Sequence, residues 1–295
     1  MLGIMYALVP MICWGLIGFV ANFIGGSAKQ QTLGMTLGAF IFAFVVFLIR
    51  RPELSWQIIL LGIVGGLIWS VGQSGQFYSM KYLGVAMASP LSGGFQLVLA
   101  ALLGVFVFGE WIRPIQYIVG FLALAVLIIA FYFSAKKDPE NTVEFEGLNL
   151  SKGFIALIYS TIGYVTYVTL FNNLAQLFWG IEVDTLTIIL PMSFGMIAGA
   201  LILAGGKVPM TKEVGKNMLL GLQWGLGNVF LLLAANEAGI TIALTFSQLG
   251  VLLSTIGSIL FLGEKKTKKE LTYLTLGGLL FALGAILLAV VKIKL

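Results

Sequence analysis

Trp69-Ser70-Val71-Gly72-Gln73 recurs 155 positions later in the chain as Trp224-Gly225-Leu226-Gly227-Asn228. Two further pairs keep a separation of 155 or 154 positions: Gly84 with Gly239, and Gly109-Glu110 with Gly263-Glu264. Three landmarks in the same order at a nearly constant separation indicate an internal repeat. The chain is therefore expected to consist of two related halves.

Both copies of the motif lie within long apolar segments. Of the 295 residues, 59% are apolar and 10% are charged, whereas soluble domains have about 25% charged residues. A helix that crosses a bilayer needs about 20 apolar residues. Ten windows meet this requirement: 4–24, 33–49, 57–79, 86–108, 116–134, 153–175, 185–204, 217–236, 240–262 and 271–292. We predict an all-α membrane protein with ten transmembrane helices and no room for a soluble domain.

The ten predicted helices divide into two sets of five. Residues 1–134 form the first five-helix repeat, 135–152 a hydrophilic linker, and 153–295 the second repeat. Because five is odd, the second repeat enters the membrane from the opposite side to the first. Inverted repeats of this kind are typical of secondary transporters, which alternate between two states that face opposite sides.

Basic residues are distributed unequally between the two sides of the predicted bundle. Five lysines and arginines lie on the side of the termini, and the other twelve, including Lys265, Lys266, Lys268 and Lys269, lie on the opposite side. Basic connections usually face the cytoplasm. The distribution predicts that both termini lie outside the cell.

The composition excludes several other functions. The net charge of +5 is spread over short gaps between apolar segments, so we expect no nucleic-acid partner. The chain has one cysteine, Cys13, and no histidine, which excludes a histidine-ligated metal site. No paired nucleophile and base, carboxylate cluster or phosphate-binding loop is evident. We expect no enzyme activity, no cofactor and no metal.

Amides and aromatic rings lie in the middle of several predicted helices. Trp69, Gln73 and Gln76 are spaced so that they share one helix face. An unpaired amide in hydrocarbon costs about 2–7 kcal/mol, so each needs a partner, water or a ligand. An indole beside amides suits a sugar, whose C–H face packs on the ring while its hydroxyls bond to the amide. The remaining candidates for substrate binding are Gln96, Tyr164, Trp224, Asn228 and Gln248.

These polar groups also have a structural interpretation. Amides often join neighbouring helices in membrane bundles, and this alternative stays open for each single residue. Hydroxyls of Ser160 and Thr161 are expected to serve packing, and Pro90 to produce either a bend that lines the cavity or a tolerated kink. Two Gly-xxx-Gly motifs, Gly34 with Gly38 and Gly195 with Gly199, predict close helix crossings.

No carboxylate lies in the middle of a predicted helix. Glu110, Glu237 and Glu264 fall at helix ends, where we expect them to be hydrated. An uncharged pathway favours a neutral substrate over a cation. Glu237 is the best candidate for proton coupling, because a shift of one helical turn in the boundary would bury it.

Short motifs follow one another along nearly the whole chain: Gly25-Gly26, Gln31-xx-Gly34-x-Thr36-x-Gly38, Trp69-xx-Gly72-Gln73-xx-Gln76, Pro90-Leu91-Ser92-Gly93-Gly94-Phe95-Gln96, Gly109-Glu110-Trp111, Ser160-Thr161-Ile162-Gly163-Tyr164, Trp224-Gly225-Leu226-Gly227-Asn228, Ser247-Gln248-Leu249 and Gly263-Glu264-Lys265-Lys266. Together they resemble the glucose/ribose uptake family of bacterial sugar transporters in the drug/metabolite transporter superfamily. The resemblance implies ten helices, a bacterial cell membrane, and proton-coupled uptake of a monosaccharide. Met192 and Asn236-Glu237 depart from the pattern of that family and leave the sugar open.

These observations predict a secondary transporter that binds a neutral monosaccharide between its halves and works by alternating access. Its partners would be the sugar, protons and the lipid bilayer. An exporter or facilitator of other small neutral metabolites on the same scaffold is the alternative, because the sequence does not fix the direction of transport.

Overall fold

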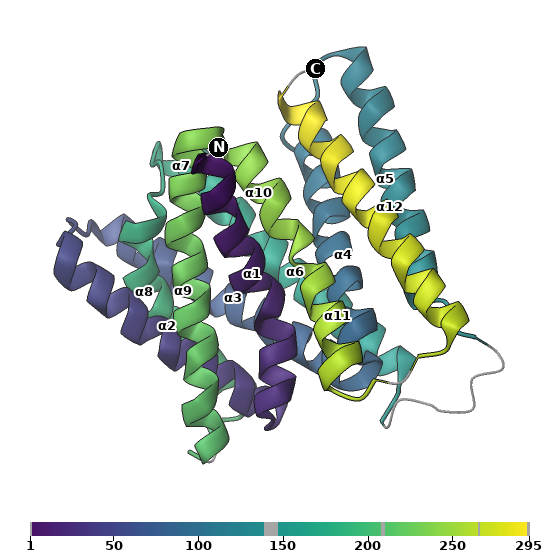
Figure 1. Cartoon of the computed structure of the whole chain (residues 1–295). Helices are drawn as coiled ribbons and strands as arrows, with labels where there is room; N and C mark the ends of the chain where they lie inside the picture. Colours follow the sequence, from purple (N-terminus) through teal and green to yellow (C-terminus); the bar gives the residue numbers. More distant parts are fainter. Residues whose placement is uncertain (1, 139–146, 208–209, 265, 294–295) are drawn as a thin grey trace.

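The computed structural model describes residues 2–138, 147–207, 210–264 and 266–293. All regular elements in these ranges are helices, so the all-α prediction is confirmed. Nine are long and apolar enough to cross a membrane: α1 (Leu2–Ile24), α2 (Ala28–Arg50), α3 (Trp56–Leu83), α4 (Val85–Phe106), α5 (Pro114–Ala135), the segment Leu150–Trp179, α8 (Thr185–Leu203), α9 (Lys212–Ala238) and α12 (Lys268–Ile293). Figure 1 shows them as one bundle.

Two predicted helices are interrupted. The window 240–262 forms two shorter helices, α10 (Ile240–Leu249) and α11 (Val251–Phe261), which meet at Gly250, so the prediction of one continuous helix is wrong there. The segment Leu150–Trp179 consists of α6 (Leu150–Thr169), a π-helical turn η1 (Leu170–Leu174) and α7 (Ala175–Trp179). Three parts of the sequence predictions lie outside the described residues: linker positions 139–146, Lys265 and the C-terminal Lys294.

Helix α2 begins five residues before its predicted start at position 33. The Ser27 side chain accepts the Gln30 N–H, and the Gln30 side chain accepts the Ser27 N–H. This reciprocal capping satisfies two N–H groups that a helix start otherwise leaves unpaired. The first turn of α2 is therefore helical, although its polar residues place it outside the predicted apolar window.

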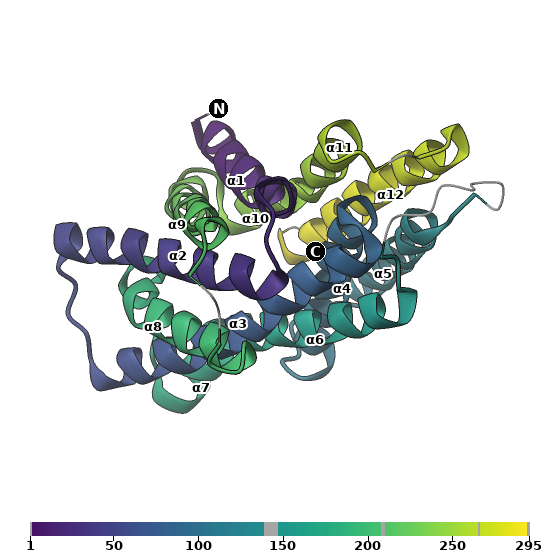
Figure 2. The ribbon, with the colours of Figure 1, turned by 90° about the horizontal axis from the view of Figure 1, so that it is seen from below.

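The main contacts join helices of different halves. Helix α3 packs against α6 and α8, and α9 packs against α1 and α2. Likewise α4 packs against α6, and α11 packs against α1. These contacts form pairs when α6, α8, α9 and α11 of the second half are matched with α1, α2, α3 and α4 of the first. The contact of α3 with α6 then corresponds to that of α9 with α1, and the contact of α3 with α8 to that of α9 with α2. Figure 2 shows α5 beside α12 at one side of the bundle and α2 near α8 at the other.

The predicted close crossings at the Gly-xxx-Gly motifs are confirmed. A Cβ atom on Gly38 of α2 would overlap the main chain of Met218 in α9. In the same way, a Cβ atom on Gly195 of α8 would overlap the main chain of Ile63 in α3. Only glycine permits such a short distance between the helix axes.

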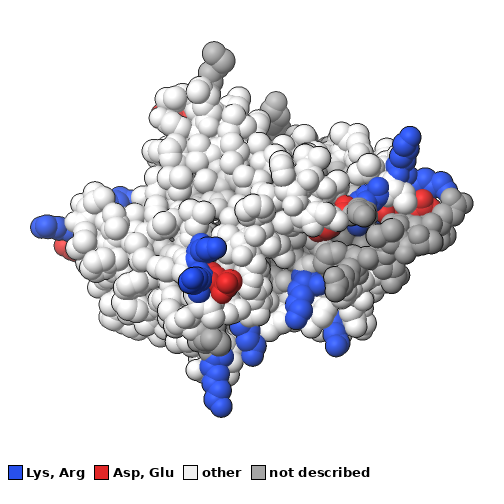
Figure 3. All heavy atoms as spheres, turned by 60° about the horizontal axis from the view of Figure 1, so that its bottom comes forward, with Lys and Arg blue, Asp and Glu red and all other residues white. Residues whose placement is uncertain are grey.

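Both chain ends lie at the same end of the bundle (Figure 1). The opposite end, here called the lysine-rich end, carries the connections α1–α2, α3–α4, α5–α6, α8–α9 and α11–α12. Figure 3 turns this end forward and shows basic side chains projecting from it beside a broad uncharged surface. The uncharged surface and the charged connections at this end are thus separated, as is typical of a helix bundle that crosses a membrane.

Candidate functional site

The two tryptophans of the repeated motif meet in the interior. The rings of Trp69 in α3 and Trp224 in α9 lie edge to face, with centroids 5.7 Å apart, and are 1% and 7% exposed. The ring of Tyr164 in α6 lies 6.2 Å from that of Trp69. The structure therefore brings together three of the predicted site residues, one from the first half and two from the second.

Two glutamines of α3 bind the hydroxyl of Tyr164. That hydroxyl donates to Gln73 Oε1 over 2.6 Å, and its oxygen lies 3.1 Å from Gln76 Oε1. Gln73 Nε2 donates to Gln76 Oε1 over 3.3 Å. The predicted spacing on one helix face thus places both amides against the same hydroxyl.

The hydrogen bonds continue into α4. Gln76 Nε2 and Gln96 Nε2 each donate to the buried Ser92 Oγ over 3.1 Å. We call Gln73, Gln76, Ser92, Gln96 and Tyr164 the amide network. It joins three helices, as the packing interpretation of the amides predicts. It also presents several donors and acceptors beside Trp69, and Gln76, Gln96 and Tyr164 are only partly buried.

The second half arranges its polar residues differently. Asn228 Nδ2 donates to the Trp224 carbonyl of its own helix over 2.8 Å. Gln248 is partly buried on α10, two residues before the helix break at Gly250. Among the described residues, no hydrogen bond connects Asn228 or Gln248 to the amide network.

Trp14 of α1 also contacts the repeated motif of α9, although the sequence analysis did not include it among the site residues. Its Nε1 donates to the Trp224 carbonyl over 3.1 Å, so α1 contributes a ring where α9 carries its motif. A signal for it exists in the sequence, because Trp14 lies 150 positions before Tyr164, the same separation that relates Asn22 to Asn172.

Two of the remaining sequence predictions are answered by the packing. The Ser160 hydroxyl donates to the Gly72 carbonyl over 2.7 Å, which confirms a packing role. Pro90 lies within α4, which is continuous from Val85 to Phe106. The interruption falls instead at Gly250 in the corresponding helix of the second half.

The three acidic residues at helix ends differ in exposure. Glu110 and Glu237 are exposed, as expected. Glu264 is only 7% exposed, so the expectation that it is hydrated is wrong. Its carboxylate accepts the N–H groups of Val85 over 2.6 Å and Ala86 over 3.2 Å, at the start of α4. Burial raises the pKa of Glu264, although these hydrogen bonds and the charge of Lys266 lower it. Unpaired N–H groups at a helix start favour such an acceptor.

Membrane-length helices around an interior of amides and aromatic rings are typical of membrane transport proteins. The family model described as Sugar transport protein matches residues 5–291. The chain belongs to that family. Together with the nine long apolar helices in the described part of the chain, this makes it a multi-pass membrane protein of bacterial type, and the family name points to a transporter rather than an enzyme.

Curated relatives match the chain along its whole length. The protein named Putative sugar uptake protein YxfA, from Lactococcus lactis subsp. lactis, is 64% identical over 294 residues, which is 100% of both chains. Putative sugar uptake protein M6_Spy1874, from Streptococcus pyogenes serotype M6, is 55% identical over 98% of this chain and 99% of its own. A solved crystal structure with 16% sequence identity superposes with a TM-score of 0.62 over 99% of both chains, a likeness that concerns the fold alone.

Proposed function

We propose that this protein takes up a neutral monosaccharide of the glucose or ribose type across the bacterial cell membrane. The observation that carries the proposal is the amide network beside Trp69. A sugar hydroxyl both donates and accepts hydrogen bonds, and an amide offers the matching groups. The indole face suits the C–H surface of a pyranose or furanose ring. The names of the relatives, which refer to sugar uptake, support the same conclusion.

The chemistry of the amide network favours an uncharged ligand. Its members are three amides, a serine hydroxyl and a tyrosine hydroxyl, which are neutral at physiological pH. A neutral polyol entering such a site exchanges hydrogen bonds with water for hydrogen bonds with the protein. A charged ligand would also have to lose its hydration without gaining a countercharge.

The paired helix contacts support an inverted repeat with residues 1–134 and 153–295 as its two units and 135–152 as the linker. Each contact of α3 with α6 or α8 has its counterpart in a contact of α9 with α1 or α2. Two units of the same structure in opposite orientation have two equivalent arrangements, which is the basis of alternating access.

In this mechanism the first half supplies most of the hydrogen bonds to the sugar. Gln73, Gln76, Gln96 and Tyr164 bind its hydroxyls, and Trp69 and Trp224 contact its ring. Asn228 and Gln248 add contacts from the second half when the halves rearrange. Rocking of one group of helices against the other then moves the site from one side of the membrane to the other.

Proton coupling completes the proposal, with Glu237 as the candidate carboxylate. Glu237 lies in the last turn of α9, next to Gly239 and the start of α10, where a rearrangement of α10 would change its surroundings. An inward proton gradient should then raise internal sugar above the external concentration in the unmodified protein. The Glu237→Gln variant should only equilibrate the sugar.

Uptake of labelled glucose and ribose by vesicles containing the purified protein tests the function. Trp69→Ala and Gln73→Ala should each abolish uptake. Gln176→Ala, which changes an exposed glutamine of α7, is the matched control and should transport normally. Normal uptake by both site variants would contradict the site. Efflux of sugar, or transport of other neutral metabolites instead, would favour the exporter or facilitator alternative.

A further inference from the structure

Two lysines meet over one tyrosine ring at the lysine-rich end, away from the amide network. Lys81 lies in the last turn of α3, and Lys152 lies in the first turn of α6. Their Nζ atoms are 5.6 and 5.9 Å from the centroid of the Tyr82 ring. The two helices belong to different halves of the chain, so it is the fold that brings these two charges together.

Main-chain contacts hold the two helix ends in this arrangement. The N–H of Asn149, just before α6, donates to the Tyr82 carbonyl over 3.0 Å. Asn149 Oδ1 accepts the Lys152 N–H over 2.9 Å and caps α6. Gly153 lies so close to the Leu83 side chain that a Cβ atom would overlap it. Packed main chain therefore places both lysines, and only their side chains have to adjust to a ligand.

The charges of Lys81 and Lys152 are not neutralised by a neighbouring acid. Among the described residues, no carboxylate forms an ion pair with either of them. The start of α12 differs, because Lys269 Nζ lies 3.6 Å from the carboxylate of the buried Asp138. Two like charges near one ring repel each other, and an anion between them would be attracted by both.

An apolar stripe runs along α6 from Lys152 toward the middle of the bundle. Ile155, Tyr159 and Ile162 follow Lys152 at separations of 3, 7 and 10 residues, which places all four on one helix face. Ile155 and Ile162 are 60% and 53% exposed. Exposed apolar side chains of a membrane-spanning helix face the lipid chains. The lysines therefore lie where a lipid-facing helix surface ends.

Tyrosines with unpaired hydroxyls lie between the charged and the apolar part of this surface. The Tyr78 ring stacks on that of Tyr82 with centroids 6.5 Å apart, and the Tyr159 ring lies against Gly75 of α3. Among the described residues, none of these three hydroxyls has a hydrogen-bond partner, whereas that of Tyr164 in the interior has. Tyrosine is enriched where membrane meets water, because its ring is apolar and its hydroxyl is polar. Charge, hydroxyls and apolar surface follow one another in the order of a phospholipid headgroup, its glycerol and its chains.

We propose that Lys81, Tyr82 and Lys152 form a binding site for an anionic phospholipid. The two ammonium groups bind the headgroup phosphate, and the lipid chains lie along Ile155 and Ile162. A zwitterionic lipid carries an additional cation that the lysines repel, so a headgroup with a net negative charge, such as that of phosphatidylglycerol, is preferred. The site lies outside the amide network and does not depend on which substrate the protein transports.

Native mass spectrometry of the delipidated protein in detergent tests the site. Dioleoyl phosphatidylglycerol or dioleoyl phosphatidylcholine is added in increasing amounts, and the affinity for the first bound lipid is measured. The unmodified protein should bind phosphatidylglycerol about tenfold more tightly than phosphatidylcholine. Dihexanoyl phosphatidylglycerol has the same headgroup on shorter chains and should bind more weakly, because it covers less of the apolar stripe.

Paired substitutions test the charges of the two lysines. Lys81→Gln combined with Lys152→Gln removes both charges and should weaken binding of phosphatidylglycerol about 25-fold, which is about fivefold for each lysine. Lys81→Arg combined with Lys152→Arg keeps both charges and should stay within about threefold of the unmodified protein. Both lysines are exposed, so all of these variants should keep the melting temperature of the unmodified protein in detergent.

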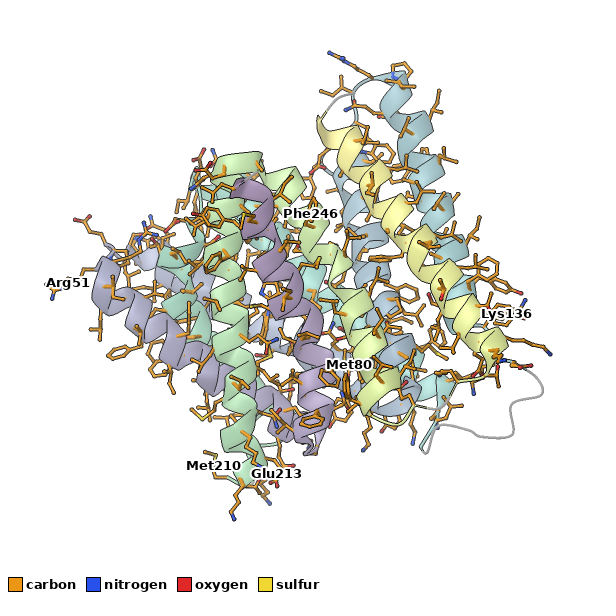
Figure 4. All side chains as sticks on the ribbon, in the orientation of Figure 1. Arg51, Met80, Lys136, Met210, Glu213 and Phe246 are labelled. Atoms are coloured by element: carbon orange, nitrogen blue, oxygen red, sulfur yellow. The ribbon has the colours of Figure 1, made fainter. Side chains whose placement is uncertain are left out.

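A matched control removes two lysines elsewhere at the same end. Lys212→Gln combined with Lys216→Gln changes two exposed residues at the start of α9. Glu213 lies between them in the sequence and supplies an opposite charge, so the affinity should change by less than about twofold. Figure 4 shows Glu213 well apart from Met80, the residue before Lys81.

Four results would overturn the proposal. The first is equal affinity of the unmodified protein for the two dioleoyl lipids. The second is an unchanged affinity for phosphatidylglycerol in Lys81→Gln with Lys152→Gln. The third is an equal loss in the control pair, which would indicate a general attraction to lysines. The fourth is displacement of the bound lipid by an equal concentration of inorganic phosphate, which would assign the lysines to a free anion.

Discussion

The two copies of the repeated motif have similar surroundings but different chemistry. In α3, Gly72 lies against Tyr164 of α6, and in α9, Gly227 lies against Trp14 of α1. The first ring carries a hydroxyl that binds two glutamines, whereas the second donates to the Trp224 carbonyl. Both copies of the motif therefore pack an aromatic ring on a glycine. Only the first copy has hydrogen bonds from its amide side chains to the ring that packs on it.

The side chains at corresponding positions of the two motifs explain this difference. Gln76 has its counterpart, 155 positions later, in Leu231, which cannot extend a network. Asn228 is one methylene shorter than its counterpart Gln73, and its amide returns to its own helix. A shorter amide and an apolar neighbour leave the second half with contacts to rings and to its own main chain.

The largest expected effect contrasts the two rings. Tyr164→Phe removes the hydroxyl that donates to Gln73 Oε1 and takes that donor away from a buried amide oxygen, so sugar uptake should fall about 10- to 100-fold. Trp14→Phe removes one of the two side-chain donors to the Trp224 carbonyl and should lower uptake only about threefold. Initial rates in vesicles measure both. Equal losses would mean that the halves contribute equally to binding.

Substitution of the two glycines tests whether the packing is equivalent. Gly72→Ala places a Cβ atom 2.9 Å from the Tyr164 ring and main chain, and Gly227→Ala places one against the Trp14 ring. Overpacking of this kind costs about 1–3 kcal/mol, so both variants should lose several degrees of thermal stability. Gly215→Ala in α9 meets open space and serves as the control. Thermal unfolding in detergent would show a difference between the halves if the packing were not equivalent.

A smaller effect is expected from the polar residue of the second motif. Asn228→Leu removes an amide whose donor bonds within its own helix, so uptake should fall about threefold. Gln73→Leu, the same change in the first motif, should cost much more because it breaks bonds to Gln76 and Tyr164. Measuring both rates with one labelled sugar gives the contrast directly. A larger loss in Asn228→Leu would reverse the proposed roles.

The smallest expected effect is a pH dependence of stability that comes from Glu264. Burial raises the pKa of Glu264 in the folded protein, against the effects of Lys266 and the N–H groups of Val85 and Ala86. A carboxyl whose pKa is higher in the folded than in the unfolded state stabilises the fold as the pH falls below that raised pKa. The melting temperature of the unmodified protein should therefore rise at acidic pH, relative to that of Glu264→Gln. Identical pH profiles would contradict the linkage.

Particular residues show how far the sequence alone predicts the site. The i, i+4 and i+7 spacing placed Trp69, Gln73 and Gln76 together, and the structure adds that they meet Tyr164. The spacing could not predict that Glu264 is buried, because the acceptor of a helix cap depends on which helix start lies beside it. Pro90 likewise did not show where a helix is broken, because its own helix α4 is continuous and the break lies at Gly250. Neighbouring helices can satisfy the main-chain groups that a proline leaves without a partner.

The apolar windows, the repeat and the glycine motifs follow from the sequence, because a lipid environment imposes helix length and close packing on local composition. Only the tertiary structure decided that the two tryptophans meet, that the amide network spans three helices, and that the carboxylate after α11 caps α4. Such contacts join residues far apart in the chain. Their energies depend on distances that no periodicity in the sequence encodes.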